Sequence, residues 1–377
     1  LVLNLAVTFP MSIFGSIITA YEHFVFPRVG NIGRILLNTV VMICLLHMGY
    51  KAIAMEVVQT VFNLLTLVLN CWYCRRHLKI RMYFRKFRWG FLKEVAVYSF
   101  WIFLNVIMDR IYWSTGQFVL GAVVGTAAVA VFAVAIQLQH LYMQFSTAVS
   151  SVFLPKVTSM VTTENDNKAI SDLFIKTGRI QYIIMALILS GFIVFGRQFI
   201  ALWAGPGYED AYIICLLFFV SLLIPLVQTL GITILQARNQ MKFRSLLYIA
   251  IALVALVFQI ILAKEYGGIG CAIAVAGALL LGQGLIMNIY YSKRQGIDIG
   301  RFWKEISKMS VVPVLLTVAA LYVIGYFSID SWLKLIVAIL SFCIVYIPLF
   351  WIFSMNEYEH GLINKPLNGF VQKFRKG

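Results

Sequence analysis

Long apolar stretches alternate with short polar segments along the whole chain. Each stretch holds about 20 predominantly apolar residues, which is the length that an α-helix needs to cross the hydrocarbon core of a bilayer. We therefore predict an all-α polytopic membrane protein. The eleven predicted spans are residues 1–21, 31–49, 52–73, 94–121, 124–155, 179–203, 211–236, 244–263, 267–291, 310–328 and 331–354.

The fourth and fifth predicted spans each carry a polar stripe. The residues of a stripe recur at steps of three and four, so they share one face of a helix. Counted from the turn near Val123, Asp109 and His140 lie within roughly 5 Å of the same depth. The two stripes are Asn105, Asp109, Tyr112 and Gly116 on the fourth span, and Gln137, His140, Gln144, Thr147 and Ser151 on the fifth.

Asp109, Arg110 and His140 place ionisable groups near the middle of the membrane. Such groups are costly there, so they usually face a bundle interior or a water-filled cavity. Asp109 and Arg110 point about 100° apart on a helix and cannot face one direction. A buried ion pair, or a contact that pins two helices together, is the alternative to a cavity. The candidate cavity-lining residues are Asn105, Asp109, Arg110, Gln137, His140, Gln144 and Gln228.

Pro10 in the first predicted span and Pro225 in the seventh occupy matched places in the chain. A proline removes a hydrogen bond from the helix interior and kinks the helix. We interpret both as candidate hinges, and a static kink is the alternative. Gln228 follows Pro225 by about one helical turn, near mid-depth of its span.

The composition supports the membrane class. Hydrophobic residues make up 61% of the chain and charged residues only 12%, with a mean hydropathy of +0.88. Soluble domains carry about 25% charged residues. The net charge of +16 does not indicate nucleic-acid binding, because no basic stripe runs along a soluble element.

Basic residues concentrate in alternate loops. One set of loops and span ends, in which we count Arg34 and Arg244, holds 26 of the 31 basic residues. The positive-inside rule makes this set cytoplasmic. The first span then enters from outside, and the C-terminus is cytoplasmic.

Three further segments are predicted to lie at the membrane surface. Residues 74–93 are basic and aromatic and predict a linker on the anionic inner leaflet. Residues 164–178 have Ile170, Leu173 and Phe174 on one face and predict a short interfacial helix. The C-terminal tail from Leu367 to Phe374 is amphipathic in the same way. We expect all three to be surface anchors and not binding sites.

No pattern of residues indicates catalysis. The chain lacks a P-loop, a nucleophile elbow, paired mid-membrane carboxylates and a His/Cys cluster with metal spacing. Cys71 and Cys74 form an isolated C-x-x-C, which is typical of two small apolar residues at a helix end. We therefore expect no enzymatic activity, no cofactor and no metal site.

An internal repeat relates spans one to three to spans seven to nine. Pro10 matches Pro225, and the Ala-Ile-Ala of residues 52–54 recurs at residues 272–274. By symmetry, three helices should precede the first copy. The chain starts inside an apolar run without an initiator Met, so we expect its N-terminal part to be missing. Parallel repeats about an axis along the membrane normal are a transporter architecture, with the substrate site between the halves.

With this repeat, the chain resembles the polysaccharide-biosynthesis flippases, which share a superfamily with the multidrug and toxin extrusion antiporters and the lipid II flippases. The resemblance implies a two-lobed fold of six plus six helices followed by two more, here without about the first three. Its domains would be residues 1–73, a linker at 74–93, a second lobe at 94–292, and two extra helices with a tail at 293–377. The matching segments are residues 103–110, 118–125, 133–139, 153–156 and 234–238.

The resemblance implies a flippase for a polyprenyl-pyrophosphate-linked oligosaccharide in the bacterial cytoplasmic membrane. It would serve O-antigen (lipopolysaccharide), capsule or exopolysaccharide synthesis. Its partners would be the lipid-linked substrate, membrane lipids, protons or sodium as coupling ions, and glycan polymerases. A cation-coupled drug antiporter of the same fold is the alternative, with Asp109 as the ion site. A membrane polymerase or ligase would need a long external loop, and the predicted external loops are short.

Overall fold

The computed structural model describes residues 2–21, 23, 25–49, 52–80, 89–163, 166–327 and 329–362. Over this part of the chain the protein is entirely helical, which confirms the predicted all-α class. Eight helical stretches in it are long and apolar enough to cross a membrane. The helices are α1 (Val2–Ala20), α2 (Val25–His47), α3 (Ala52–Arg76), α4 (Trp89–Val123), α5 (Thr126–Thr163), α6 (Asn167–Trp203), α7 (Asp210–Val227), α8 (Thr229–Ala237), α9 (Met241–Leu279), the π-helix η1 (Leu280–Ile286), α10 (Met287–Lys293), α11 (Ile299–Ile324) and α12 (Trp332–Ser354).

The chain divides into two compact units, residues Leu1–Gly90 and Phe91–Gly377. Part of the predicted basic linker, residues 81–88, lies outside the described residues, as does the predicted amphipathic tail.

In the first unit, α3 packs against both α1 and α2. Asn63 of α3 donates hydrogen bonds to Asn4 Oδ1 (2.7 Å) and Thr8 Oγ1 (2.8 Å) of α1. Arg34 Nη1 donates to Asn63 Oδ1 at 3.4 Å. The sequence analysis places Arg34 at a loop or span end, but it is the tenth residue of α2. The first unit therefore carries a polar cluster between its three apolar helices.

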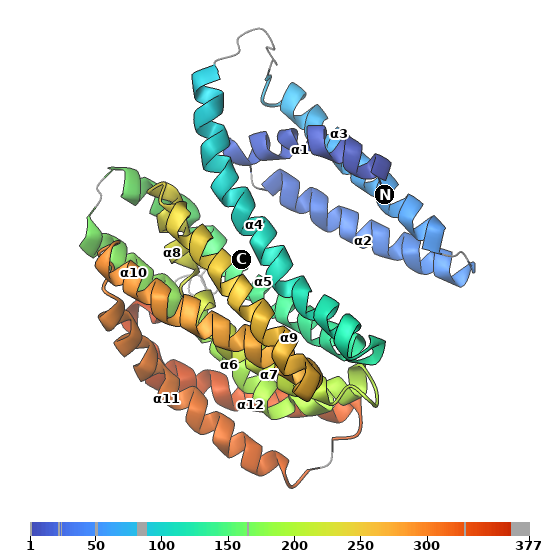
Figure 1. Ribbon diagram of the computed structural model, residues 1–377, viewed down its shortest axis with the longest axis vertical. Helices are drawn as coiled ribbons and strands as arrows, with labels where there is room; N and C mark the ends of the chain where they lie inside the picture. The colour runs from blue at the N-terminus through green and yellow to red at the C-terminus, as the bar shows by residue number, and fades with distance from the viewer. Residues whose placement is uncertain are drawn as a thin grey trace, which may run out of the picture. The chain divides into compact units, whose positions relative to one another are not determined.

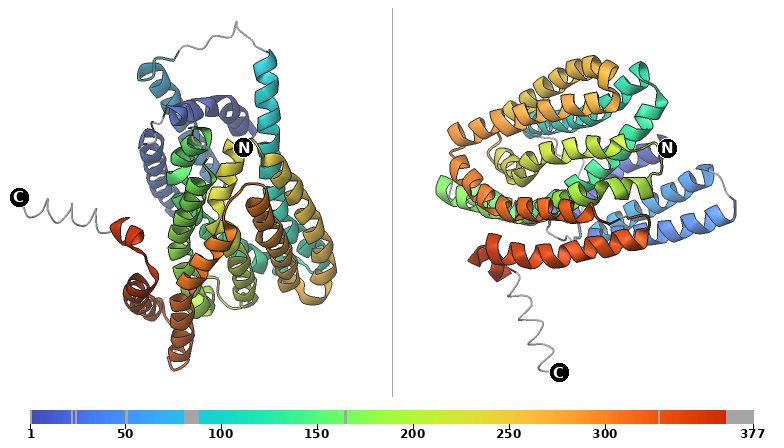
Figure 2. Two further views of the ribbon diagram at one scale, coloured as in Figure 1. Left: turned by 90° about the vertical axis from the view of Figure 1, so that its left-hand side faces the viewer. Right: turned by 90° about the horizontal axis from the view of Figure 1, so that it is seen from below.

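The second unit is a bundle of long helices (Figures 1 and 2). Within it, α5 packs against α6, α7 and α8, α7 packs against α9, and α11 packs against α6. The chain turns back on itself at Gly125 (φ 126°) between α4 and α5. It turns again within α9 at Gly267, where φ is 55° and ψ is −132°, a backbone conformation that is open to glycine. The predicted spans 244–263 and 267–291 are therefore the two arms of one hairpin.

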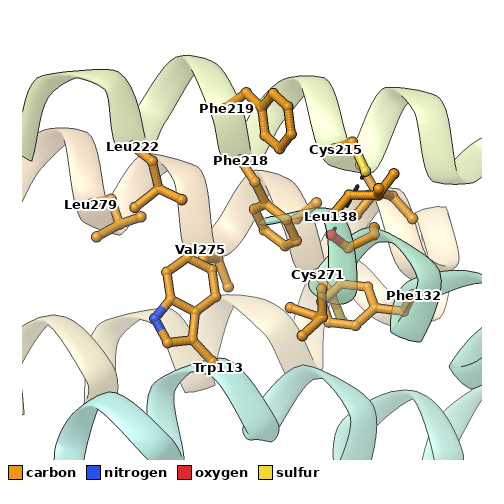
Figure 3. Close-up of a cluster of buried hydrophobic side chains, with 14 of the residues drawn as sticks. Trp113, Phe132, Leu138, Cys215, Phe218, Phe219, Leu222, Cys271, Val275 and Leu279 are labelled. Carbon is orange, nitrogen blue, oxygen red and sulfur yellow. Dashed lines mark hydrogen bonds between the residues drawn. The ribbon is translucent and has the colours of Figure 1, made fainter. Parts of the chain in front are cut away.

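Aromatic side chains fill the core of this unit (Figure 3). The ring of Trp113 on α4 meets Phe218 on α7 edge-on, with 5.5 Å between centroids, and Phe132 on α5 meets the same ring at 5.7 Å. Gly116 of α4 lies against Phe132, because a Cβ there would come within 2.7 Å of Phe132 Cζ. Small residues allow helices to approach closely in lipid, where dispersion and not the hydrophobic effect drives association. Gly116 thus serves packing.

Two predictions about the helices are wrong in detail. The predicted span 211–236 is broken at Gln228, where φ is −110° and ψ is 15°, so it forms α7 and α8. Residues 164–178 do not form a separate interfacial helix, because α6 runs without interruption from Asn167 to Trp203. Ile170, Leu173 and Phe174 are buried against other helices of the second unit and not at a lipid surface. An amphipathic pattern shows that one face is covered without showing what covers it.

Candidate functional site: a polar cavity in the second unit

A cavity of about 490 Å³ lies among the helices of the second unit. Residues of α4, α5, α7, α8, α9, η1 and α10 line it, so segments far apart in the sequence meet there. Its lining is unusually polar for a bundle of apolar helices. The polar residues of the lining are Asp109, Tyr112, Ser114, His140, Thr147, Gln228, Thr229, Gln236, Arg244, Tyr248, Gln283 and Tyr291.

Three of the predicted cavity residues, Asp109, His140 and Gln228, line this cavity. The stripes on α4 and α5 therefore converge on one space, and their functional roles stay predictions. Gln228 is 3% exposed, and its Nε2 donates to Asn288 Oδ1 at 2.7 Å. The side chains of Asn105 and Arg110 lie outside the described residues.

Gln137 and Gln144 are exposed and are not among the lining residues, unlike the sequence-based expectation. Helical geometry explains the difference. Met143 and Thr147, which do line the cavity, lie to one side of His140 around the α5 axis. Gln137 and Gln144 lie roughly 40–60° to its other side. A three- and four-residue spacing thus selects a broad face, of which the cavity takes only part.

Arg244 is a cavity residue that the sequence analysis missed. It is the fourth residue of α9, is 8% exposed, and its guanidinium carbon lies 4.5 Å from the ring centroid of Tyr248. A guanidinium over an aromatic face gains a cation–π interaction, which is stronger when the pair is desolvated. The sequence analysis counts Arg244 among the basic residues of loops and span ends, and these are expected to be exposed. The spacing of Arg244 and Tyr248 at i and i+4, which stacks them on one face, was the available signal.

Two irregular segments of helix line the cavity, the break between α7 and α8 and the π-helix η1. Pro225 lines the cavity, and α7 ends two residues later. On the facing hairpin, η1 interrupts α9 and α10, and π-helical turns occur frequently at functional sites. Asn288 joins these irregular segments, because its Oδ1 accepts from Gln228 Nε2 and from Trp303 Nε1 of α11 at 3.0 Å. Pro10 lies within α1, which continues from Val2 to Ala20.

The described residues contain no group of three or more His, Cys, Asp or Glu side chains that could hold a metal ion. The side chains that line the cavity offer ionic attraction, hydrogen bonding and proton exchange. One buried cation, one carboxylate, one imidazole and several amides and hydroxyls provide these interactions.

Long apolar helices around a polar cavity define a multi-pass membrane protein. The model of a family described as polysaccharide biosynthesis protein matches residues 24–212, just over half of the chain. This protein belongs to that family. No curated protein sequence matches it.

Among solved structures, the fold is similar to that of the lipid II flippase MurJ in an inward closed conformation. The TM-score is 0.62 and the sequence identity is 18%. The similarity covers 90% of this chain and 72% of that chain. At this identity the likeness shows a common fold.

Proposed function

We propose that this protein is a flippase that carries a polyprenyl-pyrophosphate-linked oligosaccharide across the bacterial cytoplasmic membrane for O-antigen, capsule or exopolysaccharide synthesis. The observation that supports this most directly is the buried cation of Arg244 in a polar cavity among membrane helices. A pyrophosphate that leaves water needs a positive charge and hydrogen-bond donors in its place. Membership of the polysaccharide biosynthesis family and the MurJ-like fold are consistent with this proposal.

In this mechanism, Arg244 meets the pyrophosphate, and stacking on Tyr248 holds its guanidinium in position. The amides and hydroxyls of the cavity replace water around the sugars. The polyprenyl chain stays in the lipid, which matches its apolar chemistry. Bending at Pro225 and at Pro10 would then let the two halves of the protein alternate around the substrate. Ion gradients or the membrane potential would supply the energy.

The proposed domain organisation follows the family resemblance. Residues 1–73 complete the first lobe, 74–93 form the cytoplasmic linker, 94–292 form the second lobe, and 293–377 add two helices and a cytoplasmic tail. Glycan polymerases are the proposed protein partners.

A cation-coupled antiporter of the same fold is the second candidate. The observation that favours it is the presence of both Asp109 and His140, two groups that can exchange protons, at the cavity. In an antiporter, Asp109→Asn would abolish coupling to protons or sodium. In a flippase that relies on Arg244, the same change would leave pyrophosphate binding intact.

The test uses the full-length protein in its native cell, with surface glycan as the readout. We expect Arg244→Ala to abolish glycan export at an unchanged level of protein in the membrane. Arg244→Lys should retain part of the export, because a point charge remains while the planar fork is lost. Lys242→Ala is the matched control, since Lys242 is an exposed cation two residues away on α9. Normal export by the Arg244→Ala protein would refute the proposed role of the cavity.

A further inference from the structure

Gln283 has a hydrogen-bond donor that finds no partner among the described residues. It lies in η1, is 5% exposed and lines the polar cavity, and its Nε2 makes no hydrogen bond to that part of the chain. A buried amide donor without a partner is costly, so native proteins rarely retain one without a reason. Gln228 lines the same cavity and is buried to the same degree, but its Nε2 is satisfied by Asn288. Of these two buried cavity glutamines, only Gln283 thus has an amide donor that is available to a ligand.

The irregular backbone around Gln283 is itself well supported. Asn288 Nδ2 donates to the carbonyl of Gly284, which occupies a backbone acceptor within η1. Gly282 packs so closely that a Cβ at this position would overlap the side chain of Ile251 on the first arm of α9. The π-helix therefore packs tightly against the first arm of α9, and one of its backbone carbonyls accepts a hydrogen bond from the Asn288 side chain. The fold holds Gln283 in place and leaves only its amide unused.

Gln283 and Arg244 lie at different depths in the cavity. They belong to opposite arms of the hairpin that turns at Gly267. Gln283 is 16 residues from this turn and Arg244 is 23 residues from it. The difference of seven residues corresponds to about 10 Å along the helix axes. The same count places Gln283 near the depth of Asp109 and His140. A neutral donor thus sits apart from the cation, along the length of the cavity.

We propose that Gln283 recognises the first sugar of the lipid-linked substrate, which is the sugar attached to the pyrophosphate. Its Nε2 donates a hydrogen bond to a hydroxyl or carbonyl oxygen of that sugar. This inference rests on the proposed function, in which Arg244 carries the pyrophosphate. Because Gln283 lies about 10 Å from Arg244 along the helix axes, its amide lies beyond the pyrophosphate, where a donor discriminates among neutral oxygen acceptors. A buried donor that is left unpaired by the wrong sugar penalises that sugar. Gln283 is then a specificity-determining residue.

The experiment measures binding to the detergent-solubilised full-length protein by isothermal titration calorimetry. The probes are farnesyl diphosphate and farnesyl diphosphate that carries one hexose or one N-acetylhexosamine. The variants are Gln283→Met, which keeps length and flexibility, and Arg244→Ala. Gln259→Met is the matched control, because Gln259 is a 1% exposed glutamine of α9 that does not line the cavity.

We expect Gln283→Met to weaken binding of a glycosylated probe by roughly three- to tenfold, as the loss of one neutral hydrogen bond implies. Binding of farnesyl diphosphate should not change, which also shows that the variant is folded. Gln259→Met should change neither. Equal losses on all probes, no loss on any, or a wild-type protein that does not prefer a glycosylated probe would each overturn the inference. Unchanged diphosphate binding by the Arg244→Ala protein would instead refute the proposed function.

Discussion

Arg179 of α6 and Glu359, in the short helix that follows α12, form a buried ion pair with 2.6 Å between Nε and Oε1. Arg179 is 4% exposed and Glu359 is 2% exposed. Arg179 Nη1 also contacts Glu305 of α11 at 3.0 Å, and the backbone N–H of Asn356 donates to Glu359 Oε2 at 2.9 Å. One guanidinium thus joins α6 to α11 and to the segment after α12, far apart in the sequence.

We expect Arg179→Met to destabilise the protein by about 3–5 kcal/mol, because it leaves the carboxylate of Glu359 buried without its cation. Thermal or denaturant unfolding of the purified protein in detergent measures the effect. The control is Lys308→Met, which removes the exposed partner of Glu305 and should cost no more than about 1 kcal/mol. Equal effects of the two changes would show that burial of the Arg179 pair adds nothing.

We expect cysteines introduced at positions 109 and 140 to react with a hydrophilic thiol reagent. Each replacement, Asp109→Cys or His140→Cys, is made in a protein without the six native cysteines. Both positions line the polar cavity, which water can fill. The rate of labelling in intact membranes is the measurement. A cysteine at the core residue Gln259 should stay unreactive. Protection at both cavity positions, with a reactive loop control, would show that they are packing groups.

Pro225→Ala should yield a stable protein that transports slowly. The change restores a backbone donor and removes a ring clash, so the helix gains up to about 3 kcal/mol of local stability. A difference of about 1.4 kcal/mol between inward and outward states already changes their ratio tenfold. Accessibility of a cysteine at position 109 from each side of the membrane reports the bias, and Pro10→Ala should act in the same way.

The matched control for the prolines is Pro348→Ala, since Pro348 is an exposed proline inside α12 that does not line the cavity. Transport by this variant should be normal. If the Pro225→Ala and Pro10→Ala proteins also transport normally with unchanged accessibility, both prolines are static kinks.

Gly116→Ala should destabilise the second unit by about 1–3 kcal/mol, because the added methyl group would overlap the ring of Phe132. Gly191→Ala in α6 should instead stabilise the second unit. No atom lies within 4 Å of a Cβ there, so the helix propensity of alanine should add up to about 1 kcal/mol. Unfolding of the two variants side by side provides the comparison. A stable Gly116→Ala protein would mean that α4 and α5 can separate without cost.

The sequence by itself determined the class of the protein and most of its helices. Hydrophobic length is a local property, so it locates membrane spans without any knowledge of their neighbours. Helical periodicity likewise brought Asp109 and His140 to one depth, and both line the same cavity. These inferences needed only the 1.5 Å rise and the 100° turn of an α-helix.

Only the tertiary structure decided which faces meet. Arg244 resembles a loop cation in the sequence, and its burial depends on the helices that pack against α9. Ile170, Leu173 and Phe174 have an amphipathic spacing that suits a lipid surface and a protein core equally well, and packing against the other helices decided for the core. The π-turn at Gln283 also depends on a tertiary contact, because the neighbouring Gly282 packs against Ile251 on the other arm of the hairpin. Burial and hydrogen-bond satisfaction are properties of pairs of residues distant in the chain, and local pattern does not contain them.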